Sequence, residues 1–181
     1  GRWKQAYNIA ESDTFRSLTI QDTGGTQKAI DAGIAAVRDM LPAAGAGKKV
    51  QLSVQSAFGC GFEGPVPAER VLGIAGRFLE AGFRNLSLAD TAGQGTPEQV
   101  EQLFGAILQR APDAECTAHF HNTYGLGMAN CCAALRVGVK CFESAVAGLG
   151  GCPFTKVAGG NVCTEDLVYY LQRRGLRPDV N

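Results

Sequence analysis

The chain contains only two histidines, and they lie two positions apart at His119 and His121. In a β-strand, side chains at positions i and i+2 leave the same face, and the residue between them faces the opposite side. If this stretch is a strand, both imidazoles point in one direction and can hold one metal ion. The intervening Phe120 is then expected to face a layer of helices.

Three neighbouring features favour metal binding over the simpler explanation that these are hydrogen-bonded core histidines. The predicted strand ends in a polar, glycine-containing loop at residues 122–125, as expected at a catalytic face. A glycine-rich loop that carries Cys152 follows about one βα unit later. Asn161 then precedes a predicted helix and offers a neutral oxygen ligand.

Hydrophobic periodicity predicts that strands and helices alternate along the chain. Strands are expected near residues 3–9, 50–54, 84–89, 115–121 and 139–145. Helices are expected near residues 26–41, 67–81, 96–108, 126–137 and 164–174, and residues 96–99 have the form of a capping box. This repeated order, with Gly and Pro between elements, predicts parallel strands with crossover helices.

The remaining choice is between an open doubly wound sheet and a (β/α)8 barrel. Dinucleotide binding has little support, because no GxGxxG motif follows an early strand. Residues able to do chemistry instead follow several different strands: Cys60, Asp90, His119, His121, Cys152 and Asn161. Convergence of many strand ends on one face is typical of a TIM barrel, which takes about 250 residues. We therefore expect an α/β fold in which residues 1–181, a single domain, supply part of a TIM barrel, about five or six βα units.

Composition excludes several classes of protein. Apolar residues make up 45% of the 181 residues, and 17 basic residues balance 17 acidic ones, so a nucleic-acid partner is not expected. No apolar segment approaches the roughly 20 residues of a membrane span, and no signal peptide opens the chain. The seven cysteines form no CxxC pair, which favours reduced thiols in the cytoplasm, or in the mitochondrial matrix if the source is eukaryotic. Since residue 1 is not Met, we expect that it is not the natural start.

Five motifs occur in the order and at about the spacing of one family of enzymes. They are residues 58–64 (FGCGFEG), 87–97 (SLADTAGQGTP), 119–125 (HFHNTYG), 147–153 (AGLGGCP) and 160–169 (GNVCTEDLVY). Over residues 50–175 the chain resembles hydroxymethylglutaryl-CoA lyases and related DRE-TIM metallolyases, and residues 1–49 match weakly. Such enzymes are (β/α)8 barrels that split a 3-hydroxy-3-methyl acyl-CoA with a divalent metal.

The resemblance implies a role for each candidate residue. His119, His121 and Asn161 match the metal ligands, and the mixed nitrogen and oxygen set suits Mg²⁺ or Mn²⁺. Cys152 matches the catalytic loop cysteine, Asp90 an active-site aspartate and Glu165 a supporting carboxylate; His119 is counted among the catalytic residues as well. The implied substrate is an acyl-CoA, and the implied assembly is a homodimer or higher homo-oligomer.

Simpler explanations exist for several of these residues taken alone. Asp90 at a strand end is also expected to cap the following turn, and Asn161 fits a turn. Glu165 fits the first turn of a helix, where the helix dipole favours a negative charge. The six cysteines other than Cys152 are most simply small apolar residues that fill the core.

The sequence departs from the family pattern at three places. Asn122 stands where the family usually has Asp after the second histidine, and Gly61 stands where it usually has Pro. The early Arg-Asp pair of the family, which supplies a catalytic arginine and a metal ligand, has no equivalent in residues 1–26. We therefore expect that the sequence is a segment of a longer enzyme or an inactive fragment.

Three functional alternatives remain at this point. An acyl-CoA lyase is favoured by the cysteine loop and by residues 164–167. A related Claisen condensing enzyme, of the isopropylmalate or homocitrate synthase type, shares the two histidines and the asparagine, whereas a zinc hydrolase would carry its His-x-His motif on the first strand. The third alternative is not an enzyme but a partial barrel that associates with itself through its exposed edge.

Overall fold

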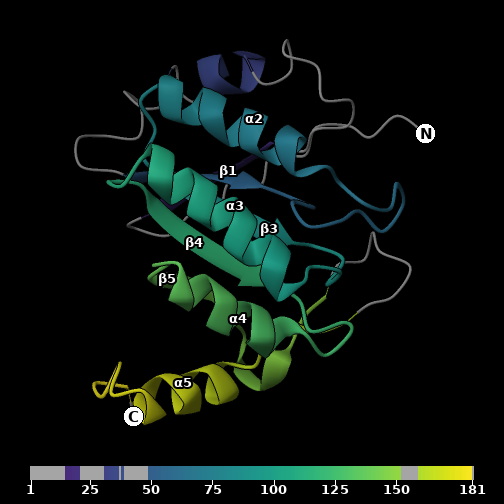
Figure 1. The fold of residues 1–181 in the computed structure, drawn as a ribbon, viewed down its shortest axis with the longest axis vertical. Coiled ribbons are helices and arrows are strands. Elements are labelled where there is room, and N and C mark those ends of the chain that lie inside the picture. Colours follow the sequence, from purple (N-terminus) through teal and green to yellow (C-terminus); the bar gives the residue numbers. More distant parts are fainter. Residues whose placement is uncertain (1–14, 21–30, 37, 39–48, 152–158, 181) are drawn as a thin grey trace.

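The computed structural model describes residues 15–20, 31–36, 38, 49–151 and 159–180. Its five strands form one parallel sheet in chain order (Figure 1). The strands are β1 Phe15–Ile20, β2 Lys49–Val54, β3 Asn85–Asp90, β4 Glu115–Phe120 and β5 Cys141–Glu143. Because all neighbours are parallel and consecutive, the carboxyl ends of the described strands meet at one edge.

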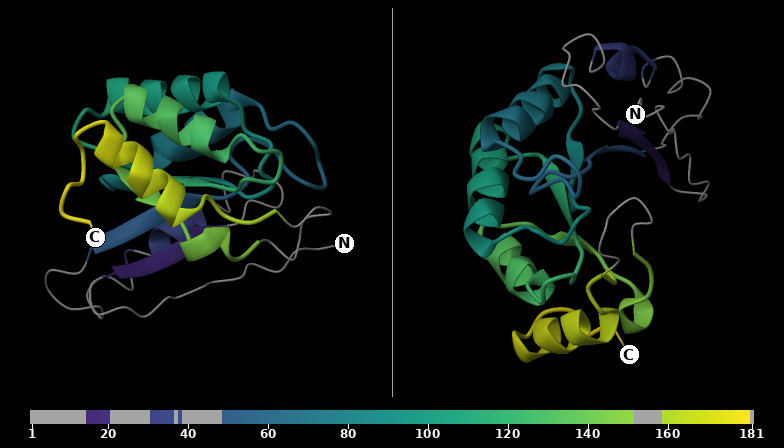
Figure 2. Two further views of the ribbon diagram at one scale, coloured as in Figure 1. Left: turned by 90° about the horizontal axis from the view of Figure 1, so that it is seen from below. Right: turned by 90° about the vertical axis from the view of Figure 1, so that its right-hand side faces the viewer.

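Helices connect the strands and lie on the convex side of the curved sheet (Figure 2). They are α2 Ala68–Glu80, α3 Pro97–Arg110, α4 Gly127–Arg136 and α5 Thr164–Arg173, with a short 3₁₀ turn η1 at Val146–Gly148. Residues 31–36 and 38 are also helical. Repeated βα units around a curved parallel sheet confirm the predicted α/β class and the partial barrel.

The two faces of the sheet differ in polarity because alternate residues of a strand face opposite sides. The face toward the helices is apolar, and its buried side chains include Leu52, Leu86, Leu88, Ala118 and Phe120. The concave face carries the intervening residues, which include Ser53, Ser87, Thr117 and His119. Burial of one continuous apolar face against helices is the main source of stability for such a unit.

A hydrogen bond crosses the concave face below the strand ends. Gln51 Nε2 on β2 donates to Thr117 Oγ1 on β4 at 2.8 Å, so that it spans β3. Ser87 lies on β3 between these strands and is only 1% exposed. The polar side chains on this face therefore pack over one another and close the surface of the sheet.

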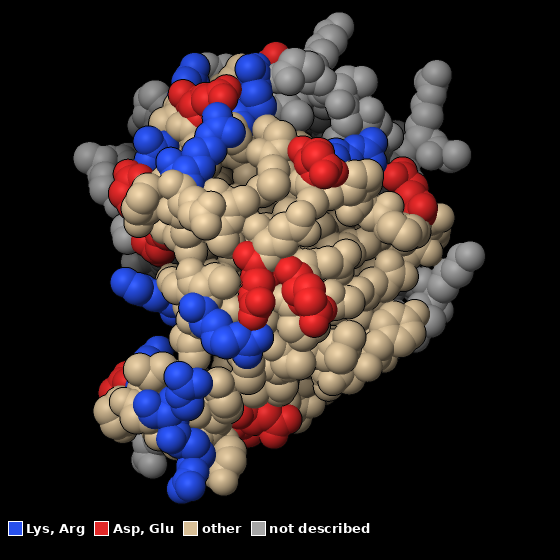
Figure 3. Space-filling view, in the orientation of Figure 1, with Lys and Arg blue, Asp and Glu red and all other residues tan. Residues whose placement is uncertain are grey.

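Ion pairs tie neighbouring helices together on the outer face. Arg110 Nη2 lies 2.7 Å from Glu80 Oε1, and Arg136 Nη2 lies 2.6 Å from Glu101 Oε1. Acidic and basic side chains accordingly lie beside one another over this surface (Figure 3). No helix in the described ranges is long and apolar enough to cross a membrane.

Most predicted elements are present, and the structure differs from the prediction at β1 and in the length of β5. The capping box is confirmed: Thr96 Oγ1 accepts from the Gln99 backbone N–H, and Gln99 Oε1 accepts from the Thr96 N–H. β1 was not predicted, because its sequence includes Arg16 and Ser17 and follows a polar stretch, yet it pairs with β2 over all six residues. The predicted strand at residues 3–9 lies outside the described residues.

The strand predicted at residues 139–145 is shorter than expected. β5 ends at Glu143, and the chain beyond it pairs with a different partner. The Ala145 N–H donates to Val162 O at 3.0 Å, and the Thr164 N–H donates to Ala145 O at 2.9 Å. The segment after the glycine-rich loop therefore takes the hydrogen bonds that a longer β5 would have used.

Candidate functional site

The two histidines project from the end of β4 with their rings side by side. Their Nε2 atoms lie 3.2 Å apart, and the ring centroids are 5.2 Å apart. Phe120 faces the helices, where its ring lies 5.6 Å from that of Phe58. Two cis ligands at about 2.1 Å from one octahedral ion would be separated by about 3 Å, so the Nε2 spacing fits a shared divalent metal.

Burial keeps His121 in the form that binds metals. Desolvation of its buried ring, together with the neighbouring His119, lowers the pKa of His121 below its ordinary value. The neutral imidazole is thereby favoured near neutral pH, and only the neutral ring offers a lone pair to a metal.

Asn161 is brought to the histidines by backbone pairing. Residues His121 and Asn161 form an antiparallel bridge, flanked by bonds from the Asn122 N–H to Gly160 O at 2.8 Å and from the Val162 N–H to Phe120 O at 3.1 Å. The Asn161 Nδ2 group donates to Leu149 O at 2.8 Å, whereas its buried Oδ1 has no hydrogen-bond partner. A buried oxygen without a partner, on a residue that pairs with His121, fits a metal ligand, because leaving a buried acceptor unsatisfied costs free energy.

These three side chains form an incomplete ligand set. Within residues 49–151 and 159–180, and the shorter described segments before them, no three His, Cys, Asp or Glu side chains gather to hold a metal. The donors present, two imidazole nitrogens and one amide oxygen, nevertheless suit the divalent metal that the resemblance implies.

Glu165 holds the turn at the start of the glycine-rich loop. Its Oε1 and Oε2 accept from the Ala147 N–H at 3.2 and 2.9 Å, and its Oε2 accepts from Cys163 Sγ at 2.8 Å. The thiol of Cys163 and then the Ala147 N–H lower the pKa of Glu165. Ala147 has a left-handed φ of 54°, so these bonds stabilise a conformation that costs a non-glycine residue free energy.

Glycines permit the close contact between this loop and the segment that carries Asn161. A Cβ added to Gly160 would lie 2.2 Å from Gly148 O, and one added to Gly150 would lie 2.7 Å from Asn161 Nδ2. Real Cβ atoms do not approach other heavy atoms so closely. The clash at position 160 is with backbone, so the two segments can lie side by side only with glycine there, and at position 150 the φ of 100° also favours glycine.

Asp90 caps the loop between β3 and α3 with both carboxylate oxygens. Oδ1 accepts from the Gln94 N–H and Oδ2 from the Gly95 N–H, each at 2.9 Å. Burial raises the pKa of Asp90, whereas these backbone N–H groups and the neighbouring His119 lower it. The contacts show that Asp90 caps the loop, and its direct part in catalysis stays a prediction.

The cysteines have different surroundings, and the predicted burial in the core holds for only two of them, since Cys60, Cys132, Cys141 and Cys163 are partly exposed. The thiols of Cys116 and Cys131 lie in the core, and burial raises their pKa to about 11 and about 12, which confirms the prediction of inert core residues for these two. Cys163 instead takes part in the Glu165 contact. Cys152, the predicted catalytic cysteine, lies outside the described residues.

Two residues near the site were missed from the sequence. Glu143 Oε2 lies 2.8 Å from His119 Nδ1, and the two residues pair in register across β4 and β5. Thr123 Oγ1 is buried without a hydrogen-bond partner, between Gly93 and Gly159, where an added Cβ on either glycine would lie 2.4 Å from it. Strand alternation predicts which β5 side chains share a face. It could place Glu143 beside His119 only once the register of β5 with β4 was known.

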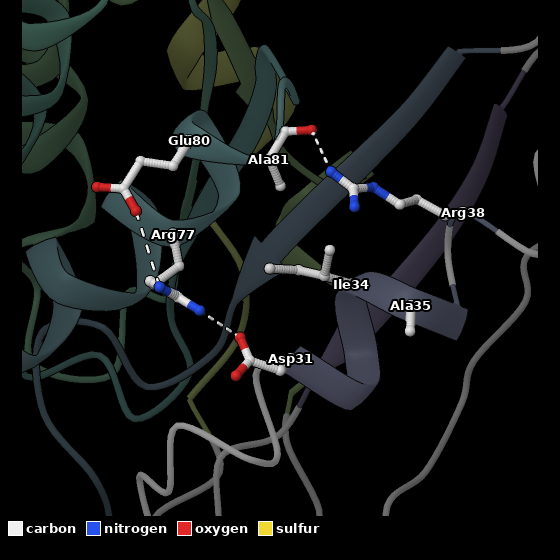
Figure 4. Close-up of a pocket in the computed structure, with 7 residues that line it drawn as sticks. All are labelled: Asp31, Ile34, Ala35, Arg38, Arg77, Glu80 and Ala81. Carbon is white, nitrogen blue, oxygen red and sulfur yellow. Dashed lines mark hydrogen bonds and ion pairs between the residues drawn. The ribbon is translucent and has the colours of Figure 1, made fainter.

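A separate pocket of about 450 Å³ lies on the helical side, between residues 31–38 and α2 (Figure 4). It is lined by Asp31, Ile34, Ala35, Arg38, Arg77, Glu80 and Ala81. Its charged side chains are already engaged: Arg77 lies 2.5 Å from Asp31 and 3.9 Å from Glu80, and Arg38 Nη2 donates to Ala81 O at 3.1 Å. This mutual pairing is typical of a packing crevice between helices.

The fold and the histidine pair define a partial TIM barrel with a candidate metal centre at its carboxyl edge. The family model described as HMGL-like matches residues 9–181. The chain belongs to this HMGL-like family, as the five motifs predicted. The family model also matches residues 9–49, where the resemblance based on the motifs was weak.

Similar proteins support the same assignment. The chain is 44% identical over 133 residues to a hydroxymethylglutaryl-CoA lyase of Pseudomonas mevalonii, covering 74% of this chain and 44% of that protein. It is 44% identical over 125 residues to an (R)-citramalyl-CoA lyase of Chloroflexus aurantiacus, covering 69% and 39%. The chain thus spans less than half the length of these relatives.

Solved structures agree with the sequence comparisons. An HMG-CoA lyase from Acinetobacter baumannii in complex with coenzyme A and 3-methylmalate superimposes with a TM-score of 0.76 at 34% identity, covering 90% of this chain and 54% of that one. An HMG-CoA lyase from Brucella melitensis gives a TM-score of 0.78 at 27% identity, covering 92% and 60%.

The capping contacts of Asp90 predict a loss of stability on Asp90→Asn. The amide supplies one acceptor oxygen where two backbone N–H groups need partners, and its NH₂ group would face a donor. The expected loss is about 1–3 kcal/mol in the free energy of unfolding, measured by urea titration. Asp113→Asn is the control, because it breaks only the exposed Arg84 ion pair and should cost at most about 1 kcal/mol. Equal effects of the two changes would contradict the capping role.

The contact between Gly160 and Gly148 predicts that Gly160→Ala displaces Asn161. The added methyl group must push the two segments apart, so Mn²⁺ binding measured by calorimetry should weaken at least about tenfold, as for a lost ligand-orienting contact. Gly105→Ala in α3 is the control: its Cβ meets nothing within 4 Å, and alanine should stabilise the helix by about 1 kcal/mol. Unchanged Mn²⁺ affinity in Gly160→Ala would show that Asn161 is not placed by this contact.

Proposed function

We propose that the protein is a metal-dependent acyl-CoA lyase that cleaves 3-hydroxy-3-methylglutaryl-CoA, or a close 3-hydroxyacyl-CoA, to acetyl-CoA and a keto acid. One observation carries the proposal: in a chain of the HMGL-like family, the Nε2 atoms of His119 and His121 lie 3.2 Å apart, and the backbone of His121 pairs with that of Asn161, whose buried Oδ1 has no hydrogen-bond partner. The named relatives support it, since most of those described are hydroxymethylglutaryl-CoA lyases.

The proposed reaction is a retro-Claisen cleavage. A base removes the proton of the tertiary hydroxyl, a carbonyl forms as the C–C bond breaks, and the electron pair of that bond passes to a thioester enolate. Protonation of the enolate carbon gives acetyl-CoA, so atoms and charges balance without an added reactant.

His119, His121 and Asn161 are the residues that would hold the divalent metal. When bound, Mg²⁺ or Mn²⁺ supplies Lewis-acid polarisation of the substrate hydroxyl and lowers its pKa. The hydrogen bond from Asn161 Nδ2 to Leu149 O keeps the amide oxygen directed away from the loop backbone. The loop clamped by Glu165 leads directly to Cys152, which is proposed to protonate the enolate.

Substrate, assembly and compartment belong to the same proposal. The (R)-citramalyl-CoA lyase among the relatives makes citramalyl-CoA the second substrate to test. A homodimer or higher homo-oligomer is proposed on the family resemblance alone. Cys116 and Cys131 are free thiols in the core, which supports a reducing compartment such as the cytoplasm or the mitochondrial matrix.

The proposal is tested by measuring acetyl-CoA release from hydroxymethylglutaryl-CoA and from citramalyl-CoA, with Mn²⁺, with Mg²⁺ and with a chelator. Metal-dependent release from either substrate is the expected result. Condensation of acetyl-CoA with a keto acid, without cleavage, would instead establish the Claisen condensing alternative.

His121→Ala is predicted to abolish Mn²⁺ binding measured by calorimetry. The change removes one of two adjacent nitrogen donors, and the remaining Nε2 cannot chelate alone. Asn122→Asp is the opposite test, because it restores the carboxylate usual in the family and can still accept from the Gly127 N–H, as Asn122 Oδ1 does at 3.0 Å. Its added negative charge should strengthen Mn²⁺ binding. Unchanged affinity in His121→Ala would end the ligand assignment.

Cys152→Ser is predicted to lower kcat strongly while metal affinity and KM stay nearly unchanged. A thiol with a pKa near ~8.5 is mostly protonated near neutrality and can donate to the enolate, whereas a serine hydroxyl is a far weaker acid. Cys131→Ser is the control: its buried thiol fills the core, so stability should fall while kcat is retained. A near-normal kcat in Cys152→Ser would show that this cysteine is not the proton donor.

A further inference from the structure

Glu143 occupies a position from which it can act on His119. The two strands pair in register at His119 and Glu143, so their side chains leave the same face of the sheet. Glu143 Oε2 lies 2.8 Å from His119 Nδ1, and the side chains are 46% and 27% exposed. The contact is thus at the rim of the concave face and partly screened from water.

The imidazole of His119 has different neighbours on its two nitrogens. Nε2 faces His121 Nε2 at 3.2 Å, on the proposed metal side. Nδ1 is itself buried, and no group in the described part of the chain meets it with aligned hydrogen-bond geometry. The Glu143 carboxylate is therefore the charged group placed at Nδ1, on a terminal bond that rotates freely enough to align.

We propose that Glu143 is a positioning residue for His119: its carboxylate accepts the Nδ1 proton and leaves the Nε2 lone pair available for a metal. This inference rests on the proposed metal-dependent function. A neutral imidazole carries one proton, and a carboxylate at Nδ1 selects the tautomer in which Nε2 is bare. The same contact fixes the rotation of the ring, so that Nε2 stays directed toward the metal side.

A purely structural role for Glu143 predicts a different effect of its removal on His119 and on metal binding. If the contact were only a surface ion pair, its loss would change neither the tautomer of His119 nor the metal affinity of the chain. The tautomer and the affinity of the metal for the chain are therefore the readouts that separate positioning from a purely structural contact.

The chain allows an unusually direct measurement, because it contains only two histidines. Proton–nitrogen correlation spectra of the metal-free, ¹⁵N-labelled chain report the tautomer of each ring, and a His121→Gln variant, which leaves one imidazole, assigns the signals. Glu143→Gln keeps an acceptor oxygen but removes the charge, and Glu143→Ala removes both. Glu101→Gln is the matched control, because it removes a carboxylate that pairs with Arg136 on the outer face.

The unaltered chain and Glu101→Gln are expected to show His119 protonated at Nδ1. Glu143→Ala should populate the Nε2-protonated tautomer and weaken Mn²⁺ binding measured by calorimetry about 10–100-fold, with Glu143→Gln between the two. A urea-unfolding midpoint for each variant confirms folding, and Glu143→Gln carries the test if Glu143→Ala does not fold.

An unchanged tautomer together with an Mn²⁺ affinity within twofold in both Glu143 variants would overturn the inference. Failure of the proposed function gives a different result. If the chain releases no acetyl-CoA but the Glu143 variants shift the tautomer and the affinity, the positioning role stands and the substrate assignment falls. If the unaltered chain binds no Mn²⁺, the tautomer in the metal-free chain still decides the role of Glu143.

Discussion

Backbone pairing between the end of β4 and residues 160–162 holds the candidate centre together. Strand alternation directs both histidines to the concave side, but it cannot by itself supply a third donor. The bridge between His121 and Asn161 brings in a residue forty positions later, and its hydrogen bonds take the place of a longer β5. The shortened strand and the site are thus two results of one backbone arrangement.

The other features of the site depend on that pairing. Because the segment at Gly160 lies against Gly148 O, position 160 has no room for a side chain, and the amide of Asn161 is held by Leu149 O. Glu165 stabilises the strained turn at Ala147 from the far side. Rigid support of this kind suits a ligand set, since a metal site loses affinity when its ligands must be ordered on binding.

Much of this arrangement could be predicted from the sequence, because it follows from local patterns. The His-x-His spacing predicted a shared face, the βα repeat predicted a parallel barrel, and residues 96–99 predicted a helix start that the structure shows. Long-range register could not be predicted, since nothing in one strand reports the alignment of another. Glu143 was missed for that reason, and β1 was missed because pairing with β2 overrides its weak local pattern. The role of Cys152 rests on the family resemblance alone.

The hydrogen bond from Gln51 to Thr117 shapes the concave face of the sheet below the candidate site. It crosses β3 on the concave face beneath the histidine layer, and Ser87 under it is almost wholly buried. On the described strands, polar side chains therefore cover the sheet on the amino-terminal side of the histidines. The groups on these strands that remain available to a ligand lie toward the carboxyl rim, on the side where Asn161 pairs with His121.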